Sequence, residues 1–262
     1  MSPTTPNTRI AIAQVQMFWT LEENMAAIRD AMAIASAQGA AICVFSELAV
    51  TGCHRRIGEF ARPELVGPAV EEISALGAKL KLAVALGAPT FDSSGAKYIT
   101  HHLIDESGQL SASISKRGLT DPEATFFARG SVRPVGHLQG LRCSVVICRE
   151  VEDHIQLSKD LPPGSVDMIF LPGSLRQDPD KPVSDPPPYV DDMRAIAQRH
   201  QAYVVQTNWP NTLNRPEESK DAGASGVVSP AGELMFRLPK ERAGVGVFNL
   251  GERTFTWHPG EA

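Results

Sequence analysis

The sequence predicts a layered α/β fold, built either on one mixed sheet or on two sheets packed together. Helical and strand patterns alternate near the start of the chain, whereas paired strands dominate further along. Short β-branched runs bounded by polar residues, such as VVI at residues 145–147, are typical of strands covered on both faces. Because no repeat or linker divides the chain, we predict a single domain over residues 9–262, after a flexible polar arm at residues 1–8.

The first expected strand covers residues 10–16, where small or apolar residues alternate with polar ones. An alanine-rich helix is expected over residues 21–38, because its apolar residues recur at helical spacing. Thr20 is suited to be the N-cap of this helix, and Gly39 is suited to end it. The apolar run of residues 41–45 predicts a second buried strand.

The same patterns extend along the rest of the chain. The apolar run before Cys148 predicts a strand that carries this thiol at its C-terminal end, where open α/β sheets place their chemistry. Residues 116–130 and the proline-rich residues 172–190 are expected to be loops. The other expected strands are residues 83–87, 97–105, 109–115, 135–138, 168–171, 203–207, 226–229 and 234–237, and the other expected helices are residues 66–79, 155–161 and 191–200.

Composition argues against several classes of function. With 42% hydrophobic and 21% charged residues among 262, the chain resembles an ordinary soluble globular protein. The net charge of −5, with no basic run, gives no basis for nucleic-acid binding. No stretch approaches the ~18 consecutive apolar residues that cross a bilayer. The four cysteines are spaced neither as a metal-binding pair nor as a disulfide scaffold, and the N-terminus lacks a secretory signal, so we expect a cytoplasmic protein.

Three ionisable residues, Glu47, Lys116 and Cys148, stand just after or at the ends of predicted buried strands. Taken singly, each has a simple structural explanation: a carboxylate at a helix start, an exposed loop amine, and a small buried hydrophobic side chain. Taken together, their types are complementary, because a thiol can be a nucleophile, a carboxylate its base and an ammonium group the stabiliser of an oxyanion. The combination indicates a site for nucleophilic catalysis.

Three sequence motifs carry a resemblance to a known family. Residues 45–52 (FSELAVTG), 115–130 (SKRGLTDPEATFFARG) and 145–150 (VVICRE) resemble the glutamate, lysine and cysteine motifs of the nitrilase, or carbon–nitrogen hydrolase, superfamily. The motifs occur in the family's order, and further similar stretches flank them, such as residues 194–208 (RAIAQRHQAYVVQTN). The chain is similar to the amidase-like branch of this superfamily.

The resemblance implies a four-layer α-β-β-α sandwich, in which a Glu-Lys-Cys catalytic triad meets at one end of the sheets. It implies that Glu47 is the general base, Lys116 the oxyanion stabiliser, Cys148 the nucleophile and Glu123 a supporting second glutamate. The implied reaction cleaves the carbon–nitrogen bond of a small amide through a thioester, without a metal or an organic cofactor. Members of the family usually pair two subunits, so a homodimer or a higher homo-oligomer is expected, without a nucleic-acid or membrane partner.

The segment after Cys148 departs from the family's pattern. The tryptophan and glutamate that follow the cysteine in nitrile hydrolysers are missing, and so is the Arg-Arg-Trp-Pro-Glu run of carbamoyl amino-acid hydrolases. An amidase acting on a linear amide is therefore the leading interpretation. The alternatives are nitrile or carbamoyl hydrolysis on the same triad, a catalytically silent binding or partner subunit, and a redox-sensing role for the Cys148 thiol.

Arg149 and Trp209 are further candidates for roles near the site, whereas two other cysteines are expected to be structural. Arg149 follows the nucleophile, where it could bind a substrate carboxylate or pair with neighbouring acidic residues such as Glu150 or Glu152. Trp209 could line the pocket or pack in the core. Cys143 precedes Cys148 by five residues, so strand alternation predicts that it faces the opposite side of the sheet, in the core. For Cys53 we expect a loop or structural role.

Overall fold

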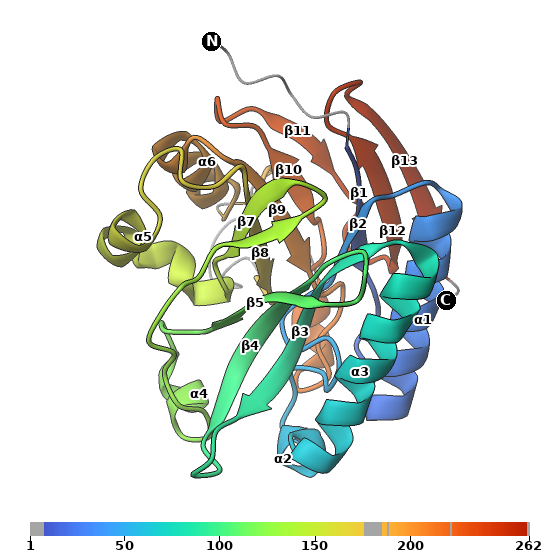
Figure 1. Ribbon diagram of the computed structural model, residues 1–262, viewed down its shortest axis with the longest axis vertical. Helices are drawn as coiled ribbons and strands as arrows, with labels where there is room; N and C mark the ends of the chain where they lie inside the picture. Colours follow the sequence, from blue (N-terminus) through green and yellow to red (C-terminus); the bar gives the residue numbers. More distant parts are fainter. Residues whose placement is uncertain (1–7, 176–184, 188, 221, 261–262) are drawn as a thin grey trace.

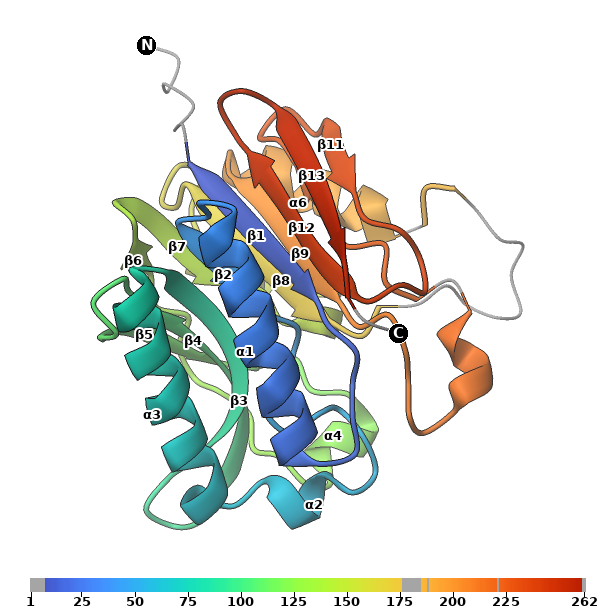
Figure 2. The ribbon, with the colours of Figure 1, turned by 90° about the vertical axis from the view of Figure 1, so that its right-hand side faces the viewer.

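Two β-sheets pack face to face between two layers of helices, as Figures 1 and 2 show. The computed structural model describes residues 8–175, 185–187, 189–220 and 222–260. The predicted N-terminal arm therefore lies, apart from Thr8, outside the described residues, and so does much of the loop predicted at 172–190. The four-layer α-β-β-α sandwich implied by the resemblance is confirmed.

The first sheet has seven strands in the order β13-β12-β1-β2-β3-β4-β5, and the second has six in the order β11-β10-β9-β8-β7-β6. Strands β1, β2 and β3 are parallel, as are β7, β8 and β9. The first sheet is made of β1 (Arg9–Gln14), β2 (Ile42–Val44), β3 (Ala83–Phe91), β4 (Lys97–Ile104), β5 (Leu110–Ser115), β12 (Gly244–Asn249) and β13 (Thr254–Pro259). The second is made of β6 (Gly136–Leu138), β7 (Leu141–Val145), β8 (Met168–Gly173), β9 (Tyr203–Asn208), β10 (Gly226–Val228) and β11 (Leu234–Arg237).

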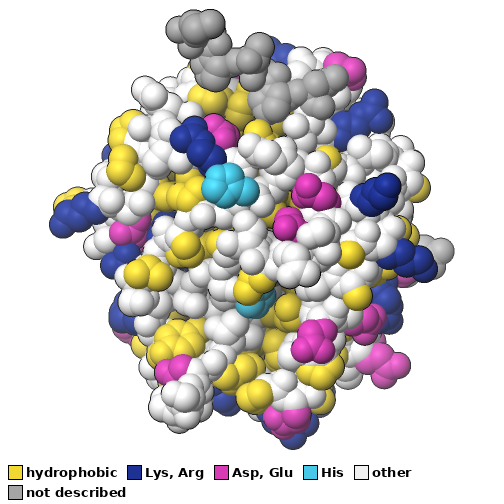
Figure 3. Space-filling view, in the orientation of Figure 1, with side chains coloured by type: hydrophobic (Ala, Val, Ile, Leu, Met, Phe, Trp, Pro, Cys, Tyr) yellow, Lys and Arg dark blue, Asp and Glu magenta, His cyan; other side chains and the backbone are white. Residues whose placement is uncertain are grey.

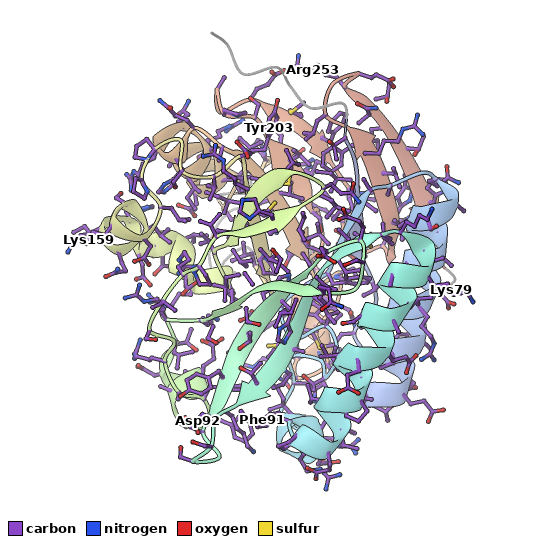
Figure 4. The ribbon with its side chains drawn as sticks, viewed as in Figure 1. Lys79, Phe91, Asp92, Lys159, Tyr203 and Arg253 are labelled. Carbon is purple, nitrogen blue, oxygen red and sulfur yellow. The ribbon has the colours of Figure 1, made fainter. Side chains whose placement is uncertain are left out.

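Each sheet has its own layer of helices on its outer face. Helices α1 (Leu21–Ala37) and α3 (Pro63–Leu80) cover the first sheet, and α5 (His154–Asp160) and α6 (Tyr189–His200) lie over the second. In Figure 4, Lys79 on α3 and Lys159 on α5 mark these two outer layers on opposite sides of the molecule. The shorter elements are α2 (Ile57–Phe60), α4 (Asp121–Ala124) and the 3-10 turns η1 (Cys148–Glu152) and η2 (Pro216–Ser219).

In the described part of the chain, three apolar clusters hold the layers together. One lies between the two sheets and includes Ile12, Val44 and Phe170, whereas the other two lie beneath the helices of each sheet. Strand residues alternate between these clusters, so that Cys143 and Val145 face the other sheet while Val146 faces α6. This alternation fixes the register of the strands, because a shift of one residue would turn every side chain of a strand to the other face of the sheet. The register in turn determines where each strand ends.

The structure confirms most expected elements and changes some bounds. Thr20 caps α1 by accepting a hydrogen bond from the Glu23 N–H, and Gly39 has a φ of +68°. Helix α3 begins three residues before the expected start, with Pro63 in its first turn, where a missing N–H costs nothing. Strands β12 and β13 are not expected from the sequence, because alternating glycines in β12 (GVGVFN) weaken the strand pattern.

The parallel strands of both sheets run in the same direction through the molecule. Tyr203, where β9 begins, lies near the upper end in Figure 4, whereas Phe91 and Asp92, where β3 ends, lie at the lower end. The C-terminal ends of β2, β7 and β8 therefore point towards the lower end, and the residues that follow them come together there.

The visible surface shows no concentration of one charge. Acidic and basic side chains are interspersed on the face drawn in Figure 3, with hydrophobic groups between them. Among the described residues, no helix has the length and apolar character needed to cross a bilayer.

Candidate active site

A buried lysine lies between two glutamates at the strand ends. Lys116 Nζ is 2.8 Å from Glu47 Oε1 and 2.6 Å from Glu123 Oε1. The side chain of Lys116 is fully buried, Glu47 is 1% exposed and Glu123 is 19% exposed, so this ion pair network is almost completely withdrawn from water. In so dry a place, the charges act on one another and on a neighbouring group much more strongly than in solvent.

The Glu47 segment is held by its backbone. Glu47 follows β2, and its carbonyl oxygen accepts a hydrogen bond from the Trp209 indole N–H at 3.0 Å. It also lies against Gly87 on β3, where an added Cβ would be 2.4 Å from Ser46 O and 2.5 Å from the Leu48 nitrogen. Gly87 is therefore required for the segment to approach β3 so closely.

The loop at residues 116–130, called the lysine loop below, also positions the carboxylate of Glu123. Lys116 follows β5 directly, and its backbone N–H donates to Ile99 O at 2.8 Å. Thr120 and Glu123 form a capping box at the start of α4, in which Thr120 N–H donates to Glu123 Oε2 at 2.8 Å. Since one oxygen of Glu123 is bound to the cap and the other to Lys116, the turn of α4 fixes the carboxylate on the lysine.

Cys148 reaches the site because the chain leaves the strand before it. Strand β7 ends at Val145, and Cys148 begins η1 with a φ of +52°. Extrapolated alternation would turn Cys148 to the same side as Val146, but it packs against the cluster between the sheets, as Cys143 does. The prediction that Cys143 is core is confirmed, whereas the prediction that the two thiols face opposite sides is wrong, because the left-handed residue reverses the direction of the side chain.

The electrostatics of the site keep the thiol protonated at rest. Burial raises the pKa of Cys148 to about 12, and the negative charge of Glu47 adds to this rise. Lys116 and the backbone N–H of Ser174 oppose it. Burial likewise raises the pKa of Glu47 above its ordinary 4.5, although Lys116 and a hydrogen bond from the Cys148 thiol lower it. The thiol is therefore neutral around neutral pH, and the pKa values of Glu47 and Cys148 are set by the same neighbours.

The charge of Lys116 is secured by its neighbours. Burial alone would lower the pKa of Lys116, but the acidic groups around it, Glu47 foremost, raise it above the ordinary 10.5. The lysine is thus a permanent cation at the site, suited to stabilising negative charge and unsuited to accepting a proton.

Glu150 connects the lysine loop to the segment that carries Cys148 by hydrogen bonds to both. From the sequence it is expected only as a possible partner of Arg149. Its side chain is fully buried and pairs with Arg133 at 2.9 Å. The same carboxylate accepts hydrogen bonds from the backbone N–H groups of Arg117 at 2.7 Å, Gly118 at 3.2 Å and Ile147 at 2.7 Å. Its place two residues after the cysteine is the one signal in the sequence, and that signal does not reveal these partners.

Arg149 is engaged by its own segment. Its guanidinium contacts Asp153 at 3.0 Å and Glu152 at 3.5 Å, and it donates to Gly118 O at 3.2 Å. These contacts match the expected pairing with an acidic neighbour, with Asp153 in addition and with Glu150 paired elsewhere. The carboxylate-binding alternative would require Arg149 to leave these partners.

Trp209 and Cys53 lie near the site but do not form part of the ion pair network. Trp209 is 1% exposed and packs beneath the helices of the first sheet, so the core interpretation holds and its indole N–H supports Glu47. Cys53 is a second thiol near the site, because Glu47, Lys116 and Cys148 all act on it electrostatically. Burial raises its pKa, which keeps it protonated.

Solved structures with the same fold include amidases and a synthetase. An amidase from Nesterenkonia sp. is 24% identical, with a TM-score of 0.79, and the match covers 94% of this chain and 91% of the amidase. A variant of the Nesterenkonia AN1 amidase in complex with butyramide is also 24% identical, with a TM-score of 0.79, over 95% of this chain and 94% of that one. Glutamine-dependent NAD+ synthetase from Acinetobacter baumannii is 19% identical, with a TM-score of 0.76, over 97% of this chain and 48% of the synthetase.

The family relationship comes from a sequence profile. No curated protein matches the chain. The profile of the family described as Carbon-nitrogen hydrolase matches residues 9–254, which is nearly the whole sequence and includes the segments of Glu47, Lys116 and Cys148. The protein therefore belongs to the carbon–nitrogen hydrolase family.

Proposed function

We propose that the protein hydrolyses a small linear amide through a thioester, with Glu47, Lys116 and Cys148 as its catalytic triad. The observation that carries this proposal is the buried ammonium of Lys116 between two carboxylates, one of which accepts a hydrogen bond from the Cys148 thiol. A nucleophile, its base and a fixed cation thus share one water-poor site, as acyl transfer requires.

In the proposed acylation step, Glu47 takes the Cys148 proton while the sulfur attacks the amide carbon. The carbonyl oxygen becomes an oxyanion, which the Lys116 ammonium stabilises. When this intermediate collapses, protonated Glu47 gives its proton to the leaving nitrogen. The carbon–nitrogen bond breaks, ammonia or an amine departs, and the acyl group remains on sulfur as a thioester.

In the proposed deacylation step, Glu47 removes a proton from water, and the resulting hydroxide adds to the thioester carbon. Collapse then breaks the carbon–sulfur bond, and Glu47 returns the proton to the sulfur. The products are a carboxylic acid and the original enzyme. In both steps Glu123 orients Lys116, since its carboxylate is held by the α4 cap.

An amide substrate has the broadest support among the alternatives. The Nesterenkonia amidase has been solved with butyramide, and a variant of it carries the acetamide moiety of fluoroacetamide covalently on its active-site cysteine. This chain also lacks the residues after the cysteine that nitrile hydrolysers and carbamoyl amino-acid hydrolases carry in the family's pattern.

An ammonia-release screen over small linear amides, ω-amides, carbamoyl compounds and nitriles tests the proposal, with Cys148→Ala as the blank. We expect ammonia from amides, and hydroxylamine added to the reaction should divert the thioester to a hydroxamate. Ammonia from nitriles or carbamoyl compounds alone would replace the amide assignment by one of those alternatives. If every class is inert and Cys148 also fails to react with fluoroacetamide, the protein is a silent binding subunit.

Assembly and location are also proposed. All four cysteines are free thiols, which fits a reducing cytoplasm. From the family resemblance we propose a homodimer, and analytical ultracentrifugation of the full chain checks it. A sedimentation coefficient of a monomer at micromolar concentration would contradict the dimer without affecting the catalytic proposal.

A further inference from the structure

We propose that Asn208 is a positioning residue, which holds the segment Gly173–Ser174–Leu175 against Cys148 and thereby sets the reactivity of the thiol. This inference rests on the proposed function only in taking Cys148 as the nucleophile. It concerns a residue that belongs to neither the triad nor its supporting glutamate, and whose side chain binds the backbone of Leu175 and Gly223.

The segment after β8 lies directly against the nucleophile. A Cβ added at Gly173 would be 3.3 Å from Cys148 Cα and 3.5 Å from its Cβ, so a side chain at this position would press against the nucleophile. The backbone N–H of the next residue, Ser174, is close enough to the sulfur to lower the pKa of Cys148. A small movement of this segment would therefore change both the space around the sulfur and the donor that supports a developing thiolate.

Asn208 binds this segment by a pair of hydrogen bonds. The Leu175 N–H donates to Asn208 Oδ1 at 2.8 Å, and Asn208 Nδ2 donates to Leu175 O at 2.6 Å. Asn208 ends β9 opposite Gly173 in the register of β8, so the side chain reaches past the last ladder pair to hold the chain beyond it. The side-chain amide thus takes the place of a further strand pair and fixes the backbone at Leu175, one residue after Ser174.

The other side of Asn208 is anchored in both sheets. Its Nδ2 also donates to Gly223 O at 2.9 Å, and its backbone N–H donates to Ser225 Oγ at 2.9 Å. Ser225 in turn donates to Gln14 Oε1 from its hydroxyl at 2.7 Å and from its N–H at 2.9 Å. Gln14 is the last residue of β1, so hydrogen bonds connect the first sheet to the segment behind the nucleophile.

The burial of this network explains why its geometry is fixed. Asn208, Ser225 and Gln14 are each 0% exposed, so their hydrogen bonds do not compete with bulk water. Both ends of the Asn208 amide are satisfied, and turning it over would place donor against donor and acceptor against acceptor. A fully satisfied buried network of this kind specifies one arrangement, which is what a precisely placed backbone donor needs.

The test measures Cys148 alkylation by iodoacetamide at several pH values, with the modified residue located by mass spectrometry, and amide hydrolysis in parallel. The variants are Asn208→Ala, which removes the side-chain bonds, and the nearly isosteric Asn208→Asp, which keeps the acceptor for Leu175 N–H and loses both donated bonds. The matched control is Asn249→Ala. Asn249 is 3% exposed and accepts from Gly251 N–H at 2.9 Å and Glu252 N–H at 3.0 Å, at the far end of the sandwich from Cys148.

We expect both Asn208 variants, assayed below their melting temperatures, to alkylate at Cys148 at least ~10-fold more slowly, and to lose kcat rather than raise KM. Asn249→Ala should stay within about twofold of wild type, although it also loses stability. Alkylation within about twofold of wild type in either folded Asn208 variant would overturn the inference. Because alkylation needs no amide turnover, a wild type without amidase activity would refute the proposed function and leave this result readable.

Discussion

Two buried charge clusters flank the lysine loop, and they differ in what their carboxylates can do. In one, Glu47 is 1% exposed and pairs with Lys116. In the other, Glu150 is 0% exposed and pairs with Arg133. Both glutamates thus lack contact with water and face a buried cation, so burial and charge alone do not distinguish them.

The difference lies in the backbone donors. Three backbone N–H groups and Arg133 bind the Glu150 carboxylate, and its pKa stays below its ordinary value although burial would raise it. Glu47 interacts with Lys116 and the Cys148 thiol, and its pKa rises. A carboxylate saturated by donors stays ionised and acts as a structural support, whereas one with fewer donors can exchange a proton. The following predictions test this contrast.

The largest expected effect comes from Cys148→Ala, which removes the proposed nucleophilic thiol beside Glu47. Amide turnover should fall at least ~1,000-fold, while the melting temperature changes little, because Cys148 is only partly buried, unlike Cys143. Cys143→Ala, in the core of the same strand region, is the control and should lower stability while sparing turnover. Substantial turnover by Cys148→Ala would refute the assignment of the nucleophile.

Glu47→Gln should remove the base and lower kcat by roughly 100- to 10,000-fold, the usual worth of a general base. Since the pKa of Glu47 is raised, wild-type kcat/KM should fall on the acid side at a pH above 4.5, where protonation disables the base. The residual activity of Glu47→Gln should lack this acid limb. An unchanged acid limb in the variant would assign the titration to another group.

Glu150→Gln should act mainly on stability, because it breaks a buried ion pair and turns an amide donor towards backbone donors. We expect a loss of about 3 kcal/mol in the free energy of unfolding at neutral pH, measured by denaturant titration. The pKa of Glu150 is lowered, so its contribution is complete above the ordinary 4.5 and disappears as the pH falls through the folded-state value. The gap between wild type and variant should therefore narrow in acid, and a constant gap would contradict this.

Arg149→Ala should have the smallest effect of the four, because the side chain is 30% exposed and pairs with acidic residues of its own turn. We expect kcat/KM for neutral and anionic amides to fall alike, by a factor of a few. A KM increase of ~10-fold or more confined to substrates with a carboxylate would instead support the substrate-binding alternative for Arg149.

The layered fold and the convergence of the main charged residues could both be predicted from the sequence. The apolar runs locate β2, β7 and β8, and the three motifs in family order predict that Glu47, Lys116 and Glu123 share a site, as their distances show. Helix α1 is predicted with its cap because Thr20 acts through a residue only three positions away. Short-range chemistry of this kind is readable from sequence order.

The supports of the site could not be predicted, because their partners are backbone groups far along the chain. Glu150 binds the N–H of Arg117, which is 33 residues away, and Asn208 binds Leu175 at the same separation. No residue type marks a backbone N–H as the partner of a given side chain. The left-handed turn at Cys148 was also missed, because alternation assumes that the strand continues and a non-glycine residue rarely takes a positive φ.

The hydrogen bond from Trp209 to the carbonyl oxygen of Glu47 links the fluorescence of this tryptophan to the position of the proposed base. Indole emission depends on the polarity around the ring and on the partner of its N–H. Trp209 is buried at 1% exposure, so its emission should lie to the blue of a solvated tryptophan. Any event that shifts the Glu47 segment, such as acylation of Cys148, will change this signal. Trp209 is thus an intrinsic fluorophore beside the proposed base, and stopped-flow fluorescence can be used to follow single turnovers without a labelled substrate.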